Sequence, residues 1–354
     1  VEVAFGPYVA LLAGVLQWLS CLTAASGVST ALVDQLGALA PAFRAPVVRA
    51  GVLTMMVAIL AHLNVRGVRL GASLVEAVTV AKLAPLLIFV AAGSFFIDPS
   101  AIAWPGFPDS ASLGRSVLLL IFAYVGVELA LAPSGEIRNP ARTVPRAIFL
   151  ALGVTTSLYV AIQLVAQGVL GPLLAQQTAA PLADAAARFL GSAGMTLMLA
   201  GAVCSMFGYQ CGDMLSTPRS LYALARDGFA PAALARIHPG YRTPSVAIWT
   251  HAVLVLLLAG TQTFQSLAII SNVAVLLLYL MSCGAALELA RRDVRTEGAP
   301  FTTPGAWAAP VLAAALIAWI LSSATVREFA AAGIVLAVAS LAYVARNRAQ
   351  SQRG

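Results

Sequence analysis

Three ionisable residues stand inside apolar stretches of this chain: Lys82, Glu128 and Asp213. A charge at bilayer depth costs at least about 2.5–3.5 kcal/mol on insertion scales unless it faces a cavity or a partner. Lys82 is also the only lysine among 21 basic residues, all the others being arginine. A lysine gives up its proton on burial far more readily than an arginine does, so this position favours a lysine-specific task. The alternative is a lysine that extends to the membrane interface, which its mid-segment position disfavours.

The two carboxylates suggest further hypotheses. The helical rise places Lys82 roughly 16 Å from the cytoplasmic end of its segment and Asp213 roughly 9 Å or more from its own end. Because the two charges then lie at similar depth, we expect a contact between them that proton binding or a conformational change can break. A carboxyl inside the membrane, such as Glu128, is a candidate proton carrier or pH sensor. A carboxyl that only hydrogen-bonds a neighbouring helix is the structural alternative.

The composition of the chain indicates where these residues reside. The 354 residues are 60% hydrophobic and 10% charged, whereas soluble proteins carry about 25% charged residues. The sequence therefore predicts an all-α, polytopic membrane protein. The net charge of +7 comes from arginines in loops, so it implies no nucleic-acid partner. The four cysteines and three histidines lack the spacing of a disulfide framework or a metal site, and we expect no metal and no other cofactor.

Runs of about 20 apolar residues predict ten membrane-spanning helices. They cover 8–33, 46–63, 71–97, 114–134, 147–170, 194–216, 245–262, 265–288, 305–323 and 327–345. Ten crossings leave both ends of the chain on one side. Fifteen arginines fall on that side and five on the other, so the positive-inside rule places both ends in the cytoplasm and the chain in the cytoplasmic membrane.

Two of these helices contain residues that weaken a helix. The helix over 114–134 contains Gly126, and the helix over 194–216 contains Gly208 and Gly212. Transporters use interrupted helices because the freed backbone groups can bind solute near the membrane midplane. Close packing against a neighbouring helix is the alternative use of these glycines.

Two stretches, each ending in a cytoplasmic loop, carry long, distinctive motifs: FAYVGVE…GEIRNPARTVPRAI and PRSLYALARDGFAP…HPGYRTPS. The second is typical of an amphipathic helix ended by Gly228 and followed by a loop. The first resembles the sixth helix and following loop of the amino acid–polyamine–organocation (APC) permeases, and the second resembles their eighth helix and its loop. The resemblance extends over essentially the whole chain. It implies an inverted five-helix-repeat transporter fold.

The resemblance also implies how the chain is organised. Residues 1–354 form a single transmembrane transporter domain, in which 1–97 supplies the family's helices three to five, 114–288 its helices six to ten, and 305–345 two C-terminal helices. The family's first two helices, with the glycine-rich break that receives the substrate carboxylate, have no counterpart in the chain. We expect an N-terminally truncated permease; a protein that truly lacks those helices would have half a site.

Individual residues receive roles from the same resemblance. Phe122 matches the aromatic gate over the substrate. Ala123, Tyr124, Val125 and Gly126 match the unwound stretch whose carbonyls receive the substrate's amino group.

Three further positions are expected to serve coupling. Glu128 matches an acidic position implicated in the pH response of some exchangers. Lys82 matches a fifth-helix lysine that occupies the space of a sodium ion in sodium-independent members. Asp213 joins them because of its depth alone, since the family assigns it no role.

The expected function is secondary active transport of amino acids or related amines by alternating access. It is expected to be sodium-independent, and either proton-coupled or an exchange. The partners are then the substrate, protons and the lipid bilayer. We expect no enzyme, because the chain has no HExxH motif, no paired aspartates and no serine–lysine dyad. The alternative is a non-transporting membrane sensor or scaffold, or an inactive fragment.

Overall fold

The computed structural model describes residues 1–67, 72–103, 106–126, 139–176, 180–294, 305 and 307–351. Every regular element in these ranges is helical, which confirms the all-α prediction. Within them, six helices are long and apolar enough to cross a membrane, and four further apolar helices are shorter.

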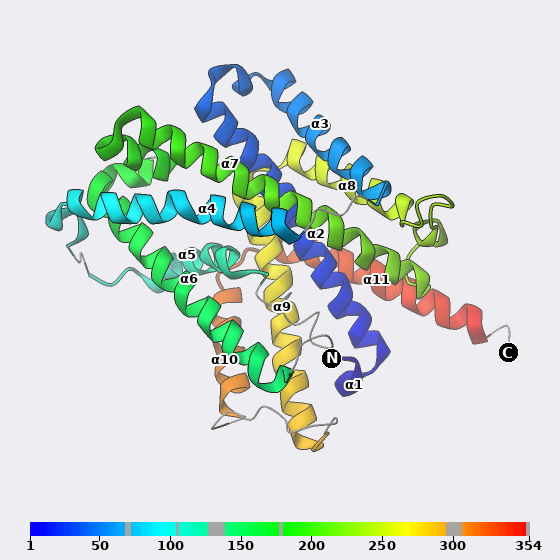
Figure 1. Ribbon diagram of the computed structural model, residues 1–354. Helices are drawn as coiled ribbons and strands as arrows, with labels where there is room; N and C mark the ends of the chain where they lie inside the picture. Colours follow the sequence, from blue (N-terminus) through cyan, green and yellow to red (C-terminus); the bar gives the residue numbers. More distant parts are fainter. Residues whose placement is uncertain are drawn as a thin grey trace. The chain divides into compact units, whose positions relative to one another are not determined.

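Each of the ten predicted segments corresponds to one helix, and a short α1 (Glu2–Phe5) precedes them (Figure 1). The helices are α2 (Pro7–Leu39), α3 (Pro46–Val65), α4 (Ala72–Gly93), α5 (Ser110–Leu120), α6 (Pro140–Leu170), α7 (Pro181–Arg226), α8 (Ser245–Thr261), α9 (Phe264–Arg291), α10 (Ala308–Leu321) and α11 (Val326–Ser351).

The helix predicted over 194–216 is the largest departure. Helix α7 begins at Pro181, a residue suited to a first helical turn, and continues through Pro218 to Arg226. The amphipathic helix expected after residue 217 is therefore the last part of α7, and it ends before Gly228, whose φ is 82°.

The interruption predicted for this helix was wrong in its position. Gly208 and Gly212 lie in continuous helix, and the residue with non-helical dihedral angles is Gly191, with φ 64° and ψ −153°. The glycine pair therefore does not break the helix. Gly191 interrupts α7 before the predicted segment begins.

The chain folds as two compact units. Unit 1 comprises Val1–Gly27, Pro108–Ile148 and Leu215–Gly354, and unit 2 comprises Val28–Phe107 and Phe149–Met214. Helices α2, α6 and α7 contribute residues to both. These units do not follow the boundaries of the repeats expected over 1–97 and 114–288, and the repeat assignment stays a prediction.

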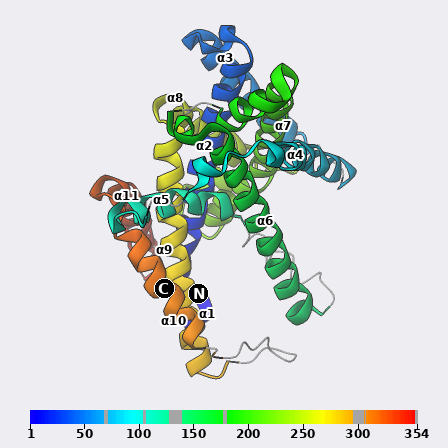
Figure 2. The ribbon, with the colours of Figure 1, turned by 90° about the vertical axis from the view of Figure 1, so that its left-hand side faces the viewer.

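Helix α9 is the central helix of unit 1. It contacts α1, α5, α10 and α11, and α10 lies alongside it in both views (Figures 1 and 2). The Ser271 hydroxyl in its buried middle donates to the Ser20 carbonyl oxygen at 2.9 Å, and the two hydroxyl oxygens lie 3.0 Å apart. Buried polar groups need such partners, so this pair fixes the packing of α2 on α9 within unit 1.

An ion pair holds the middle of α5. Arg115 donates from two guanidinium nitrogens to the Glu328 carboxylate at 2.8 and 2.7 Å. Glu328 also accepts from the Thr325 backbone N–H at 2.7 Å, the arrangement of a glutamate in the first turn of a helix. A Cβ built on Gly114 would lie 2.0 Å from Ser323 Oγ, so α5 approaches the α10–α11 turn as closely as only glycine permits.

Glu328→Gln should lower the stability of the protein by about 1–2 kcal/mol. Glutamine can still cap the helix, whereas the bidentate charged bond to Arg115 is lost. The value lies near the lower end for charged bonds because the Arg115 side chain is 40% exposed. Thermal unfolding in detergent measures the change. Asp227→Asn is the control: its pair with Arg226 is exposed on both sides, and an equal shift there would contradict a special role for Glu328.

Unit 2 has its own apolar core, formed by α4, α6 and α7 around residues such as Phe89, Val165 and Leu199. Two glycines allow the helices to approach closely. A Cβ on Gly93 would lie 2.4 Å from Val165 Cγ1, and one on Gly201 would lie 2.8 Å from Pro85 Cγ. Real Cβ atoms do not approach so near, so these glycines set the spacing of the three helices.

Gly93→Ala should therefore destabilise the protein by about 1–3 kcal/mol, the usual range for overpacking a filled core. Gly153→Ala in α6 is the matched control, because a Cβ there meets no heavy atom within 4 Å. That control should gain up to about 1 kcal/mol from helix propensity. Thermal unfolding of both variants measures the contrast, and a neutral Gly93→Ala would show that the core can expand.

Candidate functional site

The end of α5 is the first place where the predicted site residues meet. The α-helix stops at Leu120 and continues as a 3-10 turn over Ile121–Tyr124. Val125 is extended, with φ −62° and ψ 136°, and Gly126 has φ 108°. Only glycine adopts such a positive φ readily, so the chain leaves the helix here. The helix predicted over 114–134 is α-helical in its described part only up to Leu120, and residues 127–138 lie outside the described ranges.

Phe122 anchors this turn within unit 1. Its ring meets the ring of Phe264 edge to face, with centroids 5.5 Å apart and an interplanar angle of 85°. Phe264 is the first residue of α9, whose N-terminus is capped by the Thr263 hydroxyl accepting from the Ser266 N–H at 3.3 Å. Phe122 and Tyr124 are half-buried, whereas the Ala123 side chain is exposed.

The other end of α5 is capped by Asp109. Its carboxylate accepts from the Ser112 N–H at 2.9 Å. Hydrogen bonds from Ser112, first from the side chain and then from the backbone, hold the pKa of this exposed carboxyl below its usual value. The cap therefore stabilises the protein fully when the pH is above the usual pKa of an aspartate, and this contribution is lost as the pH falls through the lowered pKa.

A residue that the sequence did not single out also acts on the end of α5. Asn272 of α9 donates from its amide nitrogen to the carbonyl oxygens of Leu118 at 2.7 Å and Leu119 at 3.3 Å. The signal that could have found it is a lone asparagine in the middle of an apolar segment, because a buried amide needs partners.

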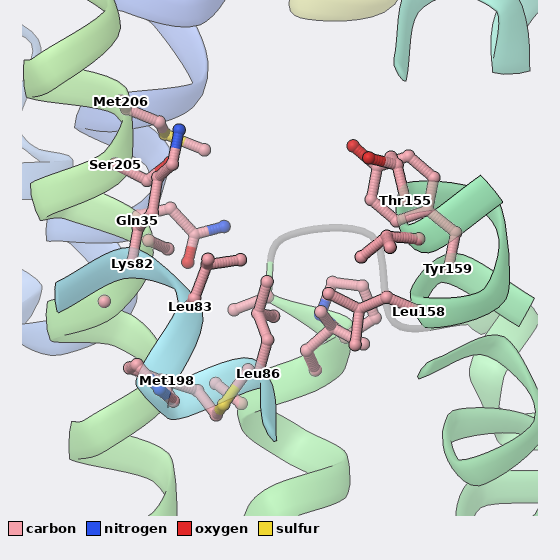
Figure 3. A pocket seen from close by; sticks show the side chains of 18 of the residues that line it. Gln35, Lys82, Leu83, Leu86, Thr155, Leu158, Tyr159, Met198, Ser205 and Met206 are labelled. Carbon is pink, nitrogen blue, oxygen red and sulfur yellow. The ribbon is translucent and has the colours of Figure 1, made fainter. Parts of the chain in front are cut away.

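The second candidate site is a cavity of about 590 Å³ in unit 2, and Lys82 is one of the residues that line it. Lys82 and Gln35 lie on one side of the space and face Thr155 and Tyr159 across it (Figure 3). Ser205 lies on the same side as Lys82, and most other lining residues are apolar. An apolar cavity with a few converging polar groups is typical of small-molecule sites.

The remaining coupling candidates are only partly placed. Asp213 is buried in α7, with 7% of its surface exposed, and it belongs to the same unit as Lys82. No ion pair joins Lys82 and Asp213 in the part of the chain that the structure describes. Glu128 lies outside that part. The Lys82–Asp213 contact and the role of Glu128 therefore stay predictions.

Comparison with known proteins decides the family. The amino acid permease family matches residues 1–346. The chain belongs to this family, within the APC superfamily. Permeases of this family are transporters and not enzymes, so the prediction of no enzyme is confirmed. The family and the apolar helices together make this permease a multi-pass membrane protein.

Individual relatives cover most of the permease chain. A methylthioribose transporter of Bacillus subtilis is 26% identical over 289 residues, 81% of this chain and 62% of the relative. An uncharacterized transporter of Mycobacterium tuberculosis is 31% identical over 244 residues, 67% of the chain and 54% of the relative. The serine/threonine exchanger SteT of B. subtilis is 28% identical over 280 residues, 78% and 64%. The chain thus spans between about half and two thirds of the length of these relatives.

Proposed function

We propose that this permease carries amino acids or related amines across the cytoplasmic membrane as a secondary active transporter working by alternating access. The observation that carries the proposal is the end of α5. There the α-helix ends at Leu120, and the motif FAYVG runs from a 3-10 turn through the extended Val125 to the positive φ of Gly126. Interrupted helices of this kind supply the backbone groups that bind solute in secondary transporters.

Within this proposal, Phe122 closes over the substrate and the backbone from Ala123 to Gly126 receives its amino group. Lys82, Glu128 and Asp213 carry the coupling, which favours protons or exchange over sodium. The cavity beside Lys82 supports this, because its ammonium lines a space large enough for water or a small solute to reach it.

The inverted-repeat architecture and the cytoplasmic position of both ends belong to the same proposal. A contact between the first and last long helices supports it. The Tyr8 hydroxyl lies 2.9 Å from Ser340 Oγ, and the rings of Tyr8 and Tyr343 are 5.0 Å apart, all within unit 1. Residue 8 near the start of α2 and residue 343 near the end of α11 can meet in this way when the number of crossings is even.

The names of the relatives point to different substrates. One is a serine/threonine exchanger and another a methylthioribose transporter. We favour amino acids or related amines for this chain because the family as a whole is one of amino acid permeases.

Uptake into proteoliposomes tests the proposal. The full-length protein is reconstituted and given a mixture of radiolabelled amino acids, with or without an inward proton gradient, a sodium gradient or unlabelled amino acids inside. We expect uptake that ignores sodium and is stimulated either by the proton gradient or by internal amino acids. Strict dependence on sodium would contradict the coupling. An absence of uptake in every condition would contradict transport and favour a sensor or scaffold.

A further inference from the structure

Asn272 lies in the most completely buried part of unit 1. Its exposed surface is 0%, as is that of Ser271, Val273 and Ala274 beside it in α9. Unlike its apolar neighbours, an asparagine brings an amide into this environment, and an amide that is buried must be paired or it destabilises the fold.

The amide is oriented by what it touches. Two carbonyl oxygens, those of Leu118 and Leu119, lie 2.7 and 3.3 Å from Nδ2. Carbonyls accept only, so the amide nitrogen must be the atom that faces them. Oδ1 is buried and has no hydrogen-bond partner among the described residues.

The bonded amide nitrogen and the unpaired amide oxygen together indicate that the donor is the useful part of this side chain. Burying an unpaired acceptor is unfavourable, and an apolar side chain would fill the same volume without that cost. What asparagine adds over leucine is the donor that reaches two backbone carbonyls.

Those carbonyls stand immediately before the change in helix type. In an uninterrupted α-helix they would accept from the backbone N–H groups of Phe122 and of Ala123. The Ile121 N–H still bonds the Val117 carbonyl, as in an α-helix. Residues 121–124 then form a 3-10 turn, a conformation in which an N–H bonds the carbonyl three residues earlier and not four. Asn272 thus supplies a donor at the level where the α-helical pattern is lost.

We propose that Asn272 is a positioning residue of the transport site. Its amide holds the carbonyls at the end of α5 and thereby fixes the point at which the backbone of Phe122–Gly126 leaves the helix. The inference rests on the proposed function, in which this backbone receives the substrate. Asn272 acts through α5 and is not assigned a contact with the substrate.

Asn272→Asp gives the sharpest test, because aspartate has the same shape and donates only when protonated. At acidic external pH the protonated carboxyl can still donate to a carbonyl, and the KM for uptake should stay within about threefold of the wild-type value. At alkaline pH the carboxylate faces two carbonyl oxygens, and the KM should rise at least tenfold. Asn272→Leu should raise the KM about tenfold at every pH. If the aspartate variant followed the leucine variant across the whole pH range, the proposal would be overturned.

Ser271→Ala is the matched control. It removes a buried hydroxyl from the neighbouring position of α9 whose bonds go to Ser20 and not to α5. It should lower thermal stability but leave the KM within about twofold of wild type. An equal change of KM in Ser271→Ala would reduce Asn272 to general packing and contradict the proposal.

A second readout needs no transport. Ala123→Cys is placed in a background whose four native cysteines are replaced by alanine, and the rate of its maleimide labelling is measured. We expect Asn272→Leu to change that rate at least fivefold and Ser271→Ala to leave it unchanged. An unchanged rate in Asn272→Leu overturns the positioning role. If the wild type transports nothing but the labelling rate responds as expected, the proposed function fails and the positioning of α5 stands.

Discussion

Replacing Lys82 by alanine should abolish the stimulation of uptake by a proton gradient, with a fall of at least about tenfold under a gradient. The physical reason is that Lys82 is the only lysine of the chain and lines the cavity of unit 2, where water and protons can reach its ammonium. Alanine leaves no group there that binds a proton. Initial rates of uptake into proteoliposomes, with and without the gradient, measure the effect.

Lys82→Arg and Leu83→Ala complete the experiment. Arginine keeps the positive charge but holds its proton at any accessible pH, so this variant should also lose the response to pH. Leu83 lines the same cavity, and its truncation should preserve the response. Uptake by Lys82→Ala that still follows the pH gradient would remove Lys82 from the coupling.

The second large effect is expected at Gly126. Gly126→Ala should reduce the maximal rate of uptake at least about tenfold, although a Cβ there meets no heavy atom within 4 Å. The obstacle is the backbone: a φ of 108° is unfavourable for any side chain, at a cost of order 1–3 kcal/mol. The residue relieves this strain by rotating φ, which moves the backbone that the proposal assigns to the substrate.

Gly106→Ala is an unusually close control. Gly106 has φ 112°, and a Cβ built on it likewise meets no heavy atom within 4 Å, but it lies in the loop before α5. It should suffer the same local strain and leave transport unchanged. Equal losses of transport in the two variants would show that Gly126 matters for folding alone. Uptake assays normalised to the amount of folded protein separate the two results.

The positions of the long helices were predictable because a bilayer-length apolar run is a strong signal. The ends were less so. After the interruption at Gly191, α7 starts close to the predicted residue 194, but it continues ten residues beyond the predicted end, to Arg226. Backbone hydrogen bonding needs no apolar side chains, so hydropathy marks the membrane-spanning part of a helix and not where the helix stops.

The candidate site also contains features that the sequence could predict and features that it could not. The turn from Phe122 to Gly126 is one continuous stretch of sequence, so a motif could locate it. Asn272 could not be assigned that way, because its meaning depends on the packing of α9 against α5, more than 150 residues earlier in the chain. The cavity beside Lys82 is lined by residues of α2, α4, α6 and α7, and a local sequence pattern cannot predict which helices come together.

The bidentate pair between Arg115 and Glu328 links α5 to the turn between α10 and α11. In the proposed transport cycle, any movement of α5 would therefore also displace this turn, because the ion pair joins the two. A protein or small molecule that binds Ser322–Thr325 would restrain α5 as well, and under the proposed function it would slow transport without occupying the substrate site. The turn is therefore a candidate site for an allosteric inhibitor.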